Sequence, residues 1–316
     1  MAGPKGKFIV AENPTTPPFG PEGAVYAIGN FDGVHCGHLA VLERAKALAA
    51  RLRLPVAALT FEPHPVDHFV GKPVVFRLTD AGLKSDALRA AGLDGSVTLT
   101  FDATLAGVTA TEFLDDVLGR RLGAKGVVIG WDFHFGRDRG GTPAFLVEEG
   151  ARRRLAVEIV ARVDDADAGA FSSTAARKAL EAGDVAAAAR ILGRAYRVRG
   201  EVVSGRKLGR TLGVPTANVV LPASNRLKHG VYAVETLIDG MRRGGVASFG
   251  TRPTVDDGAP LLETFVFDFD GDLYGRTIEV GFLAWLRDEM KFNSLEGLQS
   301  AMAADIAEAK AIWAKR

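Results

Sequence analysis

The sequence predicts a chain in two parts: an α/β domain with a doubly wound parallel sheet, then an all-β barrel with a C-terminal helix. In the first half, apolar runs such as residues 24–28 alternate with segments of helical spacing such as 38–51. That alternation is typical of a parallel sheet covered by helices. After about residue 193, short runs are separated by glycine, proline and aspartate, which favours an antiparallel barrel or sandwich. Residues 294–314 have the spacing of one amphipathic helix.

The first half contains the elements of the parallel sheet in order. Its predicted strands are 24–28, 54–61, 96–101, 126–130 and 156–160, and its predicted helices are 38–51, one ending at 90, 111–122, one starting at 143, and one from 172 to about 183. Pro63 and Pro65 argue against a helix after the second strand, so we expect a shaped loop there. Ligands of such sheets bind at the carboxyl ends of the strands, where the unusual loops of this half lie.

The second half is predicted to be mainly strands. The strand-like runs are 196–203, 231–237, 245–249, 262–269 and 277–282. The segment Val185–Leu192 is the expected join, so the predicted domains are residues 1–185 and 186–316. Before the last helix, Ser294 stands where a capping residue is expected.

Composition excludes several classes of function. The chain has 316 residues and a net charge of +1, so nothing indicates binding to nucleic acid or to a membrane surface. One cysteine, Cys36, excludes an internal disulfide and suits a reducing compartment. No apolar run approaches the roughly 20 residues that span a bilayer. We therefore expect a cytoplasmic protein with small-molecule substrates, and the sequence leaves its oligomeric state open.

The stretch 29–38, GNFDGVHCGH, is the strongest candidate for a phosphate site. A strand, a glycine-rich turn and a helix N-terminus bring backbone N–H groups to one point. His35 and His38 are three residues apart and can face one side of the helix start as donors to a phosphoryl group. The expected nucleotide contacts in the turn are Gly29, Phe31, Asp32 and Gly33. Zinc is a weaker interpretation, because the histidines lack cysteine partners on their face.

Three further patterns follow later strands of the first half. His64 and His68 have metal-ligand spacing only if a helix forms there, so a substrate-shaping loop is favoured. Phe133 and Phe135, with arginines in the loop that follows, favour an aromatic-lined pocket for a phosphate ligand over an ordinary strand end and flexible loop. The segment 172–177, SSTAAR, has three hydroxyls at a helix start and an arginine on the same face, more than capping requires.

Two segments of the second half indicate a phosphate and metal site. The loop 205–213, GRKLGRTLG, combines glycines with cations that neutralise phosphate; its candidate contacts are Gly205, Lys207, Gly209, Arg210 and Thr211. In the next segment, Thr216 and Asn218 alternate and so face one side of an extended chain. Their oxygens are hard ligands suited to Mg²⁺.

A carboxylate interrupts an apolar strand of the same half. Glu263 is either on a solvent face or in a site, where it could accept a proton from an attacking hydroxyl. Asp268, Asp270 and Asp272 resemble a calcium loop but lack the closing glutamate, so a solvated hairpin turn is favoured.

The segments GNFDGVHCGH, TFEPHP, GWDFHFG and SSTAAR, in this order, resemble the adenylyltransferase half of bacterial bifunctional riboflavin kinase/FAD synthetases, within the HxGH nucleotidyltransferases. The resemblance implies a Rossmann-like domain that transfers AMP from ATP to FMN, giving FAD and pyrophosphate. It implies that His35 and His38 hold ATP phosphates and that Asp132 contacts substrate. It also implies nucleotide binding by Ser173, Thr174 and Arg177.

The segments KLGRTLGVPTANV, GVYAV, SFGTRPTV and ETFVFDFDGDLYG resemble the riboflavin kinase domain of the same family, and the two resemblances cover about residues 22–312. This one implies a six-stranded Greek-key barrel. It implies that Thr216 and Asn218 bind Mg²⁺–ATP, that Glu263 activates the ribityl hydroxyl of riboflavin, and that Arg287 lies in a segment bordering the flavin.

The expected function is therefore conversion of riboflavin to FMN and of FMN to FAD, with ATP and Mg²⁺. Family members often have arginine at the position of Cys36 and glutamine at that of Leu39. These departures support an alternative, an active kinase with a decayed or regulatory first domain. A flavin carrier without catalysis is a third hypothesis, which the presence of Glu263 argues against, since binding needs no base.

Overall fold

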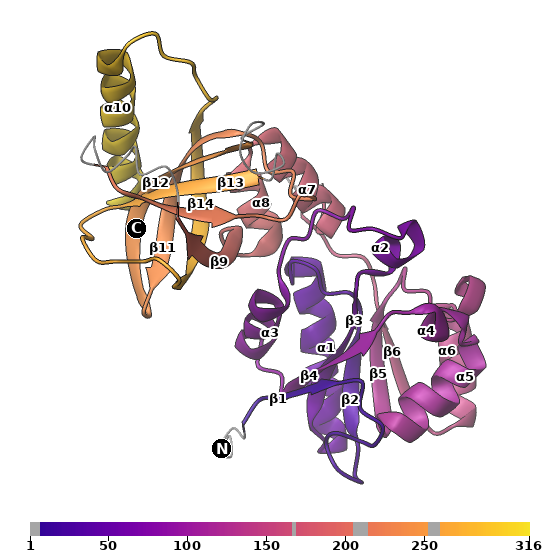
Figure 1. Cartoon of the computed structure of the whole chain (residues 1–316). Coiled ribbons are helices and arrows are strands. Elements are labelled where there is room, and N and C mark those ends of the chain that lie inside the picture. The colour runs from indigo at the N-terminus through magenta and orange to yellow at the C-terminus, as the bar shows by residue number, and fades with distance from the viewer. Residues whose placement is uncertain (1–6, 166–168, 205–213, 252–259) are drawn as a thin grey trace. The chain divides into compact units, whose positions relative to one another are not determined.

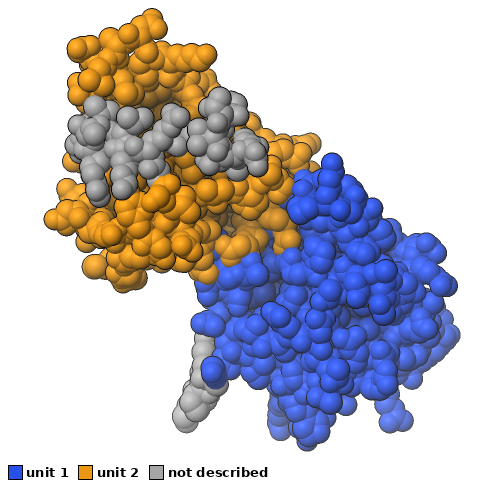
Figure 2. Space-filling view, viewed as in Figure 1, with its two compact units in different colours: residues 1–75, 81–171 blue, residues 76–80, 172–316 orange. Residues whose placement is uncertain are grey.

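The computed structural model describes residues 7–165, 169–204, 214–251 and 260–316 (Figure 1). The chain divides into two compact units, which Figure 2 colours separately. The first unit contains residues 1–75 and 81–171, and the second contains 76–80 and 172–316. No helix within the described ranges is long and apolar enough to cross a membrane.

The first unit is built on a six-stranded sheet whose neighbours all pair in parallel, in the order β1-β4-β3-β2-β5-β6. The strands are β1 (Ile9–Glu12), β2 (Ala24–Ile28), β3 (Val56–Glu62), β4 (Gly95–Thr100), β5 (Ala124–Gly130) and β6 (Ala156–Val160). The five predicted strands are thus confirmed within two residues at their ends. β1 was missed because it is a short edge strand and mostly exposed.

Helices cover both faces of this sheet, which is the doubly wound arrangement predicted. The described helical elements of the unit are α1 (Cys36–Leu52), α2 (Pro65–Val70), α3 (Ala81–Ala90), α4 (Ala103–Gly107), α5 (Ala110–Glu112), η1 (Phe113–Arg121), η2 (Arg137–Arg139) and α6 (Pro143–Arg152). Tyr26 packs in one core with η1 and α6, whereas its neighbours Val25 and Ala27 pack in the other core with α1 and α3. Alternate residues of one strand thus serve two cores.

One local expectation in this unit was wrong. A helix, α2, does form after Pro63, because Pro65 occupies its first turn, where a missing N–H costs nothing. The predicted helix 111–122 is confirmed: α5 begins it, and from Phe113 to Arg121 it continues as a π-helix. The described chain also forms a small antiparallel pair, β7 (Asp164–Asp165) with β8 (Gly169–Ala170).

The second unit contains a closed barrel with strand order β10-β13-β12-β11-β14-β9. Its strands are β9 (Arg197–Val203), β10 (Thr216–Val220), β11 (Gly230–Ile238), β12 (Met241–Thr251), β13 (Pro260–Val266) and β14 (Thr277–Arg287). Each pairs antiparallel with its neighbours. β11, β12 and β13 form a meander, and β14 returns beside β11, which is a Greek key. The expected barrel is confirmed.

Helices and one distant segment complete the second unit. They are α7 (Ser173–Ala182), α8 (Val185–Leu192) and α10 (Leu295–Trp313), which is capped by Ser294 as expected. The segment 76–80 also belongs here. Phe76 is fully buried, and its ring lies edge-on to Tyr196, 6.1 Å between centroids. The predicted boundary between the two domains, at residues 185 and 186, stays a prediction.

Candidate active sites

The first candidate site lies where β2 ends. β3 lies on one side of β2 and β5 on the other, and the loops after such strands form the crevice where ligands bind in doubly wound folds. The turn 29–35 follows β2, and α1 begins directly after it at Cys36. The predicted phosphate-binding turn therefore has the strand–turn–helix setting that was expected.

His35 and His38 lie together at the start of α1. His35 is the N-cap, and its Nδ1 accepts a hydrogen bond from the backbone N–H of His38 at 3.2 Å. The two rings stack with centroids 3.6 Å apart. Phe31 is buried and meets the His38 ring edge-on at 5.2 Å. The capping bond and the aromatic contact hold both imidazoles in one orientation, as a donor pair for a phosphate requires.

The backbone of this turn explains its glycines. Gly33 has φ +83°, and Phe31 and Val34 also have positive φ, so the chain reverses sharply before the helix. At Gly37 a Cβ atom would lie 2.8 Å from the carbonyl oxygen of Phe171 and 3.1 Å from the His35 ring. A side chain at Gly37 would therefore clash with the Phe171 backbone and press on the His35 ring.

Polar contacts connect the loop after β2 with β3 and with the loop after β3. The Thr60 hydroxyl donates to the carbonyl of Asn30 at 3.0 Å, and Asn30 Nδ2 lies 3.4 Å from His64 Nε2. Lys84 of α3 is buried, and its ammonium lies 2.6 Å from a carboxylate oxygen of Glu62. We did not predict Lys84 from the sequence. Its position four residues before the buried Leu88 places it on the same face of the helix and could have indicated that it is buried.

The other histidine motif of this unit is structural in the described chain. His64 caps α2, with its Nδ1 accepting from the backbone of Val66 at 3.2 Å, and His68 packs edge-on against Phe69 and Phe101. No group of three or more metal-ligating His, Cys, Asp or Glu side chains occurs among the residues that the structure describes. Metal binding by His64 and His68 has no support here.

The loop after β5 contains both buried aromatic residues and an exposed aspartate. Phe135 is buried against Phe113 and Phe145, and Phe133 stacks beside it with centroids 5.9 Å apart. This favours the structural interpretation of the two phenylalanines over a ligand pocket. Asp132 is exposed at the end of the strand, and its carbonyl contacts His134 Nδ1 at 2.9 Å. Asp132 remains the substrate-contact candidate of this loop.

The hydroxyl motif at 172–177 begins α7, as predicted. Ser172 is the N-cap and accepts from the N–H of Ala175 at 3.1 Å, which leaves Ser173 and Thr174 in the first turn. Arg177 donates through Nε to the carbonyl of Phe76 at 2.7 Å. The arginine thus has a structural role in the second unit besides the phosphate role predicted for it.

The second candidate site lies across three neighbouring strands of the barrel. Asn218 of β10 is paired in register with Glu263 of β13, which is paired with Ser248 of β12. Residues opposite each other in antiparallel strands point to the same side, so these three side chains share the outer face of the barrel with Thr216. Thr216, Asn218 and Glu263 therefore lie on one face of two neighbouring strands, and their action as one site stays a prediction.

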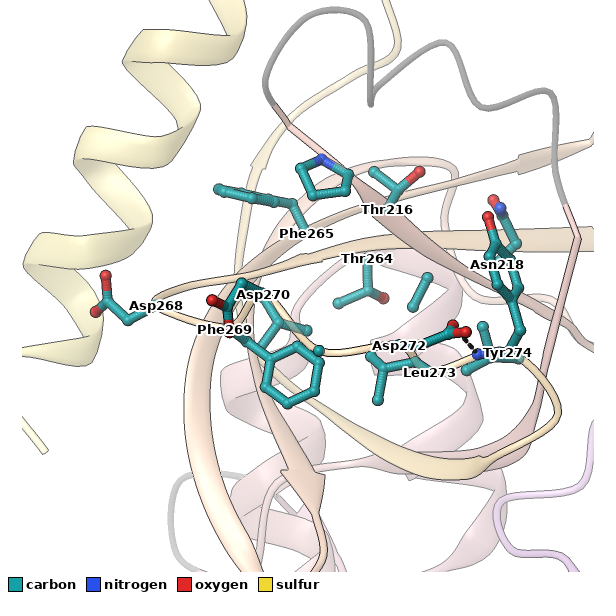
Figure 3. A pocket seen from close by; sticks show the side chains of 15 residues that line it. Thr216, Asn218, Thr264, Phe265, Asp268, Phe269, Asp270, Asp272, Leu273 and Tyr274 are labelled. Atoms are coloured by element: carbon teal, nitrogen blue, oxygen red, sulfur yellow. Dashed lines mark hydrogen bonds between the residues drawn. The ribbon is translucent and has the colours of Figure 1, made fainter.

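A cavity of about 620 Å³ opens beside these strands (Figure 3). Thr216 and Asn218 line it along β10. Asn218 is buried, and its Oδ1 has no hydrogen-bond partner in the described part of the chain. A buried acceptor without a partner is costly unless a ligand satisfies it, and a hydroxyl beside an amide oxygen suits a hard cation. The residues present therefore fit Mg²⁺.

The opposite wall of the cavity is the turn between β13 and β14. Asp268, Asp270 and Asp272 line it and are all exposed, and Asp272 accepts from the N–H of Tyr274 at 3.0 Å. The three carboxylates are solvated, as the sequence favoured, but the predicted hairpin is wrong, because β13 and β14 are not neighbours in the barrel. The basic loop with Gly205, Lys207, Gly209, Arg210 and Thr211 lies outside the described residues.

Arg287, predicted to border the flavin, closes β14. Its guanidinium binds Asp305 of α10 through two hydrogen bonds of 2.9 and 2.7 Å, and it donates to the carbonyl of Asp288 at 2.9 Å. Asp305 is mostly buried. In this structure Arg287 fastens the C-terminal helix to the barrel.

The two folds and their candidate sites are those of a two-domain enzyme that makes flavin nucleotides. Each half of the chain also matches one family model. The model described as FAD synthetase matches residues 19–175, and the one described as riboflavin kinase matches residues 192–313. The chain belongs to the family of bifunctional riboflavin kinase/FMN adenylyltransferases.

The family assignment rests also on whole-chain similarity. The chain is 43% identical to the bifunctional riboflavin kinase/FMN adenylyltransferase of Pseudomonas fluorescens, over 92% of this chain and 94% of that protein. It is 40% identical to the protein of that name from Escherichia coli K12, over 90% and 91%. A solved structure titled as a macrolide-efflux protein from Streptococcus pneumoniae is 32% identical, with a TM-score of 0.82 over 94% of this chain and 97% of that one.

Proposed function

We propose that the chain phosphorylates riboflavin to FMN in residues 186–316 and adenylylates FMN to FAD in residues 1–185, using ATP in both steps. The observation that supports this most is the pairing of Asn218 with Glu263 beside the cavity. Because the two residues lie on adjacent strands, the pairing supports the roles of cation ligand and proton acceptor, the two functions that a hydroxyl kinase needs. The stacked His35 and His38 support the second activity.

In the kinase step, the ribityl hydroxyl oxygen of riboflavin attacks the γ-phosphorus of ATP, and the bond from that phosphorus to the ADP oxygen breaks. Glu263 accepts the hydroxyl proton, which raises the nucleophilicity of the oxygen. Thr216 and Asn218 would hold Mg²⁺ against the phosphates. When bound, Mg²⁺ supplies neutralisation of the charge on the transferred group. The strand pairing keeps base and cation ligands at fixed separation, so that catalysis comes mostly from positioning.

In the adenylyl step, a phosphate oxygen of FMN attacks the α-phosphorus of ATP, and pyrophosphate leaves. His35 and His38 donate hydrogen bonds to the phosphates as charge develops, assisted by the N-terminal end of α1. Gly29, Phe31, Asp32 and Gly33 form the turn around them. Asp132 as a substrate contact, and Ser173, Thr174 and Arg177 as nucleotide contacts, remain proposals from the motif resemblance.

The departures at Cys36 and Leu39 bear on an alternative, in which only the kinase is active. Cys36 is half-buried as the first residue of α1, and Leu39 packs against the core beneath that helix. Leu39 thus has an apolar role that needs no catalytic explanation. This favours the bifunctional proposal, for which we also expect a cytoplasmic setting because both steps consume ATP.

A chromatographic assay tests the proposal. The protein is incubated with riboflavin, ATP and Mg²⁺, and FMN and FAD are scored separately, with a chelator replacing Mg²⁺ in a parallel sample. We expect both products with Mg²⁺ and neither with the chelator. FMN without FAD, including when FMN is supplied directly, would favour the kinase-only alternative. Flavin binding without turnover would favour a carrier and reject both enzymatic hypotheses.

A further inference from the structure

We propose that Lys84 is a positioning residue for adenylyl transfer: its buried ammonium orients the phosphate-binding turn 29–35 and, through that turn, His38. This inference rests on the proposed adenylylation of FMN. It adds to that site a residue that acts through other groups and does not itself touch the substrate.

Lys84 is a buried charge in the first unit. It is 3% exposed and lies in α3 between Leu83 and Leu88, which are also buried. Lysine is rarely buried unless it is paired, because removing its charge from water is costly. A methionine or leucine would fill a similar volume without that cost. The polar contacts of the ammonium therefore indicate what the charge contributes.

The ammonium contacts two side chains of β3. It lies 2.6 Å from a carboxylate oxygen of Glu62 and 3.4 Å from the hydroxyl oxygen of Thr60. Thr60 is 2% exposed, and its hydroxyl donates to the carbonyl of Asn30 at 3.0 Å. A hydroxyl has a single proton. Because Thr60 gives that proton to Asn30, it accepts from Lys84, and the three groups form a one-way relay of hydrogen bonds.

The charge at the start of this relay strengthens its second bond. An ammonium that donates to a hydroxyl makes the hydroxyl a better donor, and burial keeps water from competing for either bond. The acceptor, Asn30, lies in the phosphate-binding turn. Lys84 in α3 and the turn after β2 are thereby connected through Thr60, which lies on the strand between them.

The relay leads to the histidine pair. The peptide group is planar, so a held carbonyl at Asn30 also orients the peptide unit that enters Phe31. Phe31 has a left-handed φ of +48°, and its buried ring meets the His38 ring edge-on at 5.2 Å. A continuous series of contacts therefore connects Lys84 with His38, the proposed donor to the phosphates.

Loss of the ammonium should disorder the turn. In Lys84→Met, Thr60 loses the charged donor that orients its hydroxyl, and the peptide unit between Asn30 and Phe31 takes up several orientations. A phosphate ligand must then reorder the turn on binding. Its apparent affinity falls by the fraction of molecules whose turn is already ordered.

A second paired lysine of the first unit is the matched control. Lys46 of α1 lies 2.7 Å from a carboxylate oxygen of Glu43 and donates to the carbonyl of Ala91 at 3.0 Å. Within the described ranges, these polar contacts do not include the turn 29–35. Lys46→Met therefore removes a positive charge and an ion pair without breaking the relay.

The measurement is made on the full chain with Lys84→Met, Thr60→Val, the double variant, Thr60→Ser and Lys46→Met. FAD formation from FMN is followed with ATP varied, and inhibition by inorganic pyrophosphate gives its Ki. Both KM and Ki report only the molecules that bind, so a smaller folded fraction changes neither. Riboflavin phosphorylation and chemical denaturation are measured in parallel.

We expect Lys84→Met and Thr60→Val each to raise KM for ATP and Ki for pyrophosphate about three- to tenfold, the value of one hydrogen bond. The double variant should have no larger effect than either single variant, because both break the same relay. Thr60→Ser keeps the hydroxyl and should restore both constants. Lys46→Met should behave as wild type, and riboflavin phosphorylation should stay unchanged throughout.

Several outcomes would overturn the inference. If Lys84→Met lowers the free energy of unfolding but leaves KM and Ki at wild-type values, Lys84 has only a structural role. Multiplied effects in the double variant would show that Lys84 does not act through Thr60. An equal effect of Lys46→Met would assign the change to lost positive charge in general.

The threonine variants decide the matter if Lys84→Met does not fold. A wild-type Ki for pyrophosphate in Thr60→Val would then reject the relay, and a raised Ki that Thr60→Ser restores would support it. In all these cases the wild-type chain still makes FAD, so the adenylylation proposal survives. If the wild-type chain makes no FAD from FMN and ATP, that proposal and this inference fail together.

Discussion

The two candidate sites hold their groups in different ways. In the first unit, the histidines and nearby polar groups lie on turns that follow β2, β3 and β5, and short-range contacts such as the His35 cap fix them. In the barrel, Thr216, Asn218 and Glu263 lie within strands, and sheet pairing fixes them. A turn-based site depends on backbone conformations that few residues adopt, whereas a strand-based site depends on register. Substitutions should therefore damage the two sites independently and by different routes.

The largest expected effect is at the strand carboxylate. Glu263→Gln keeps the size of the side chain and removes its proton acceptor, so FMN formation should fall about 10²- to 10⁴-fold. FAD formation from supplied FMN should not change. Glu201→Gln, at an exposed position of β9, is the control and should leave both rates unchanged. Loss of both activities in folded Glu263→Gln would contradict the independence of the sites.

The converse substitution is expected to have a somewhat smaller effect. His38→Gln removes one imidazole of the stacked pair, and FAD formation should fall about 10²- to 10³-fold, as for loss of one preorganised donor. Riboflavin phosphorylation should stay at the wild-type rate. His229→Gln, an exposed histidine of the barrel unit, serves as the control. A His38→Gln variant that still makes FAD normally would remove the histidine pair from the proposed mechanism.

A third substitution tests how the barrel holds its C-terminal helix. Arg287→Leu leaves the mostly buried Asp305 without its two hydrogen bonds, so the free energy of unfolding should fall by about 1 to 3 kcal/mol. Asp305→Leu should have a similar effect, and the double variant should lose less than the sum of the two. Chemical denaturation measures all three. Additive losses would mean that the pair does not fasten α10.

The smallest effect concerns alkaline pH and compares one buried tyrosine in each unit. Burial raises the pKa of Tyr26, and burial followed by the charge of Asp288 raises that of Tyr232. Each hydroxyl donates to a backbone carbonyl, of Leu122 and Lys228 respectively. Above a pH of about 10 the unfolded chain loses these protons first, so each tyrosine should lower the stability of its unit by about 1.4 kcal/mol per pH unit.

Stability measured against pH from 8 to 11 checks this sign. Tyr26→Phe should flatten the alkaline slope of the first unit only, and Tyr232→Phe that of the second unit only. Below pH 9 neither substitution should change the slope. An unchanged alkaline slope in both variants would show that other groups govern it.

The fold could be predicted from sequence where local patterns dominate. Apolar runs identified five of the six strands of the parallel sheet, and Ser172, Ser294 and Gly183 marked helix ends correctly. α2 was missed because proline was weighed as a helix breaker, although Pro65 stands at the position that tolerates it. β1 was missed because a short exposed edge strand has little apolar signal.

The candidate sites were predictable to the extent that one segment contains each motif. The segment 29–38 and the pair Thr216 and Asn218 were found in this way. The partners supplied by distant segments were not: Lys84 beside Glu62, and Asp305 on Arg287. These depend on packing and strand register, which spacing along the chain does not encode.

The segment 76–80 has a consequence for how this chain can be divided. Because these residues belong to the barrel unit, the polypeptide passes from one unit to the other three times, at 75/76, 80/81 and 171/172. A barrel fragment cut from residue 172 would lack Phe76, and Tyr196 would lose that aromatic neighbour. A cut of the chain at any single junction between 80 and 172 would therefore separate Phe76 from the ring of Tyr196.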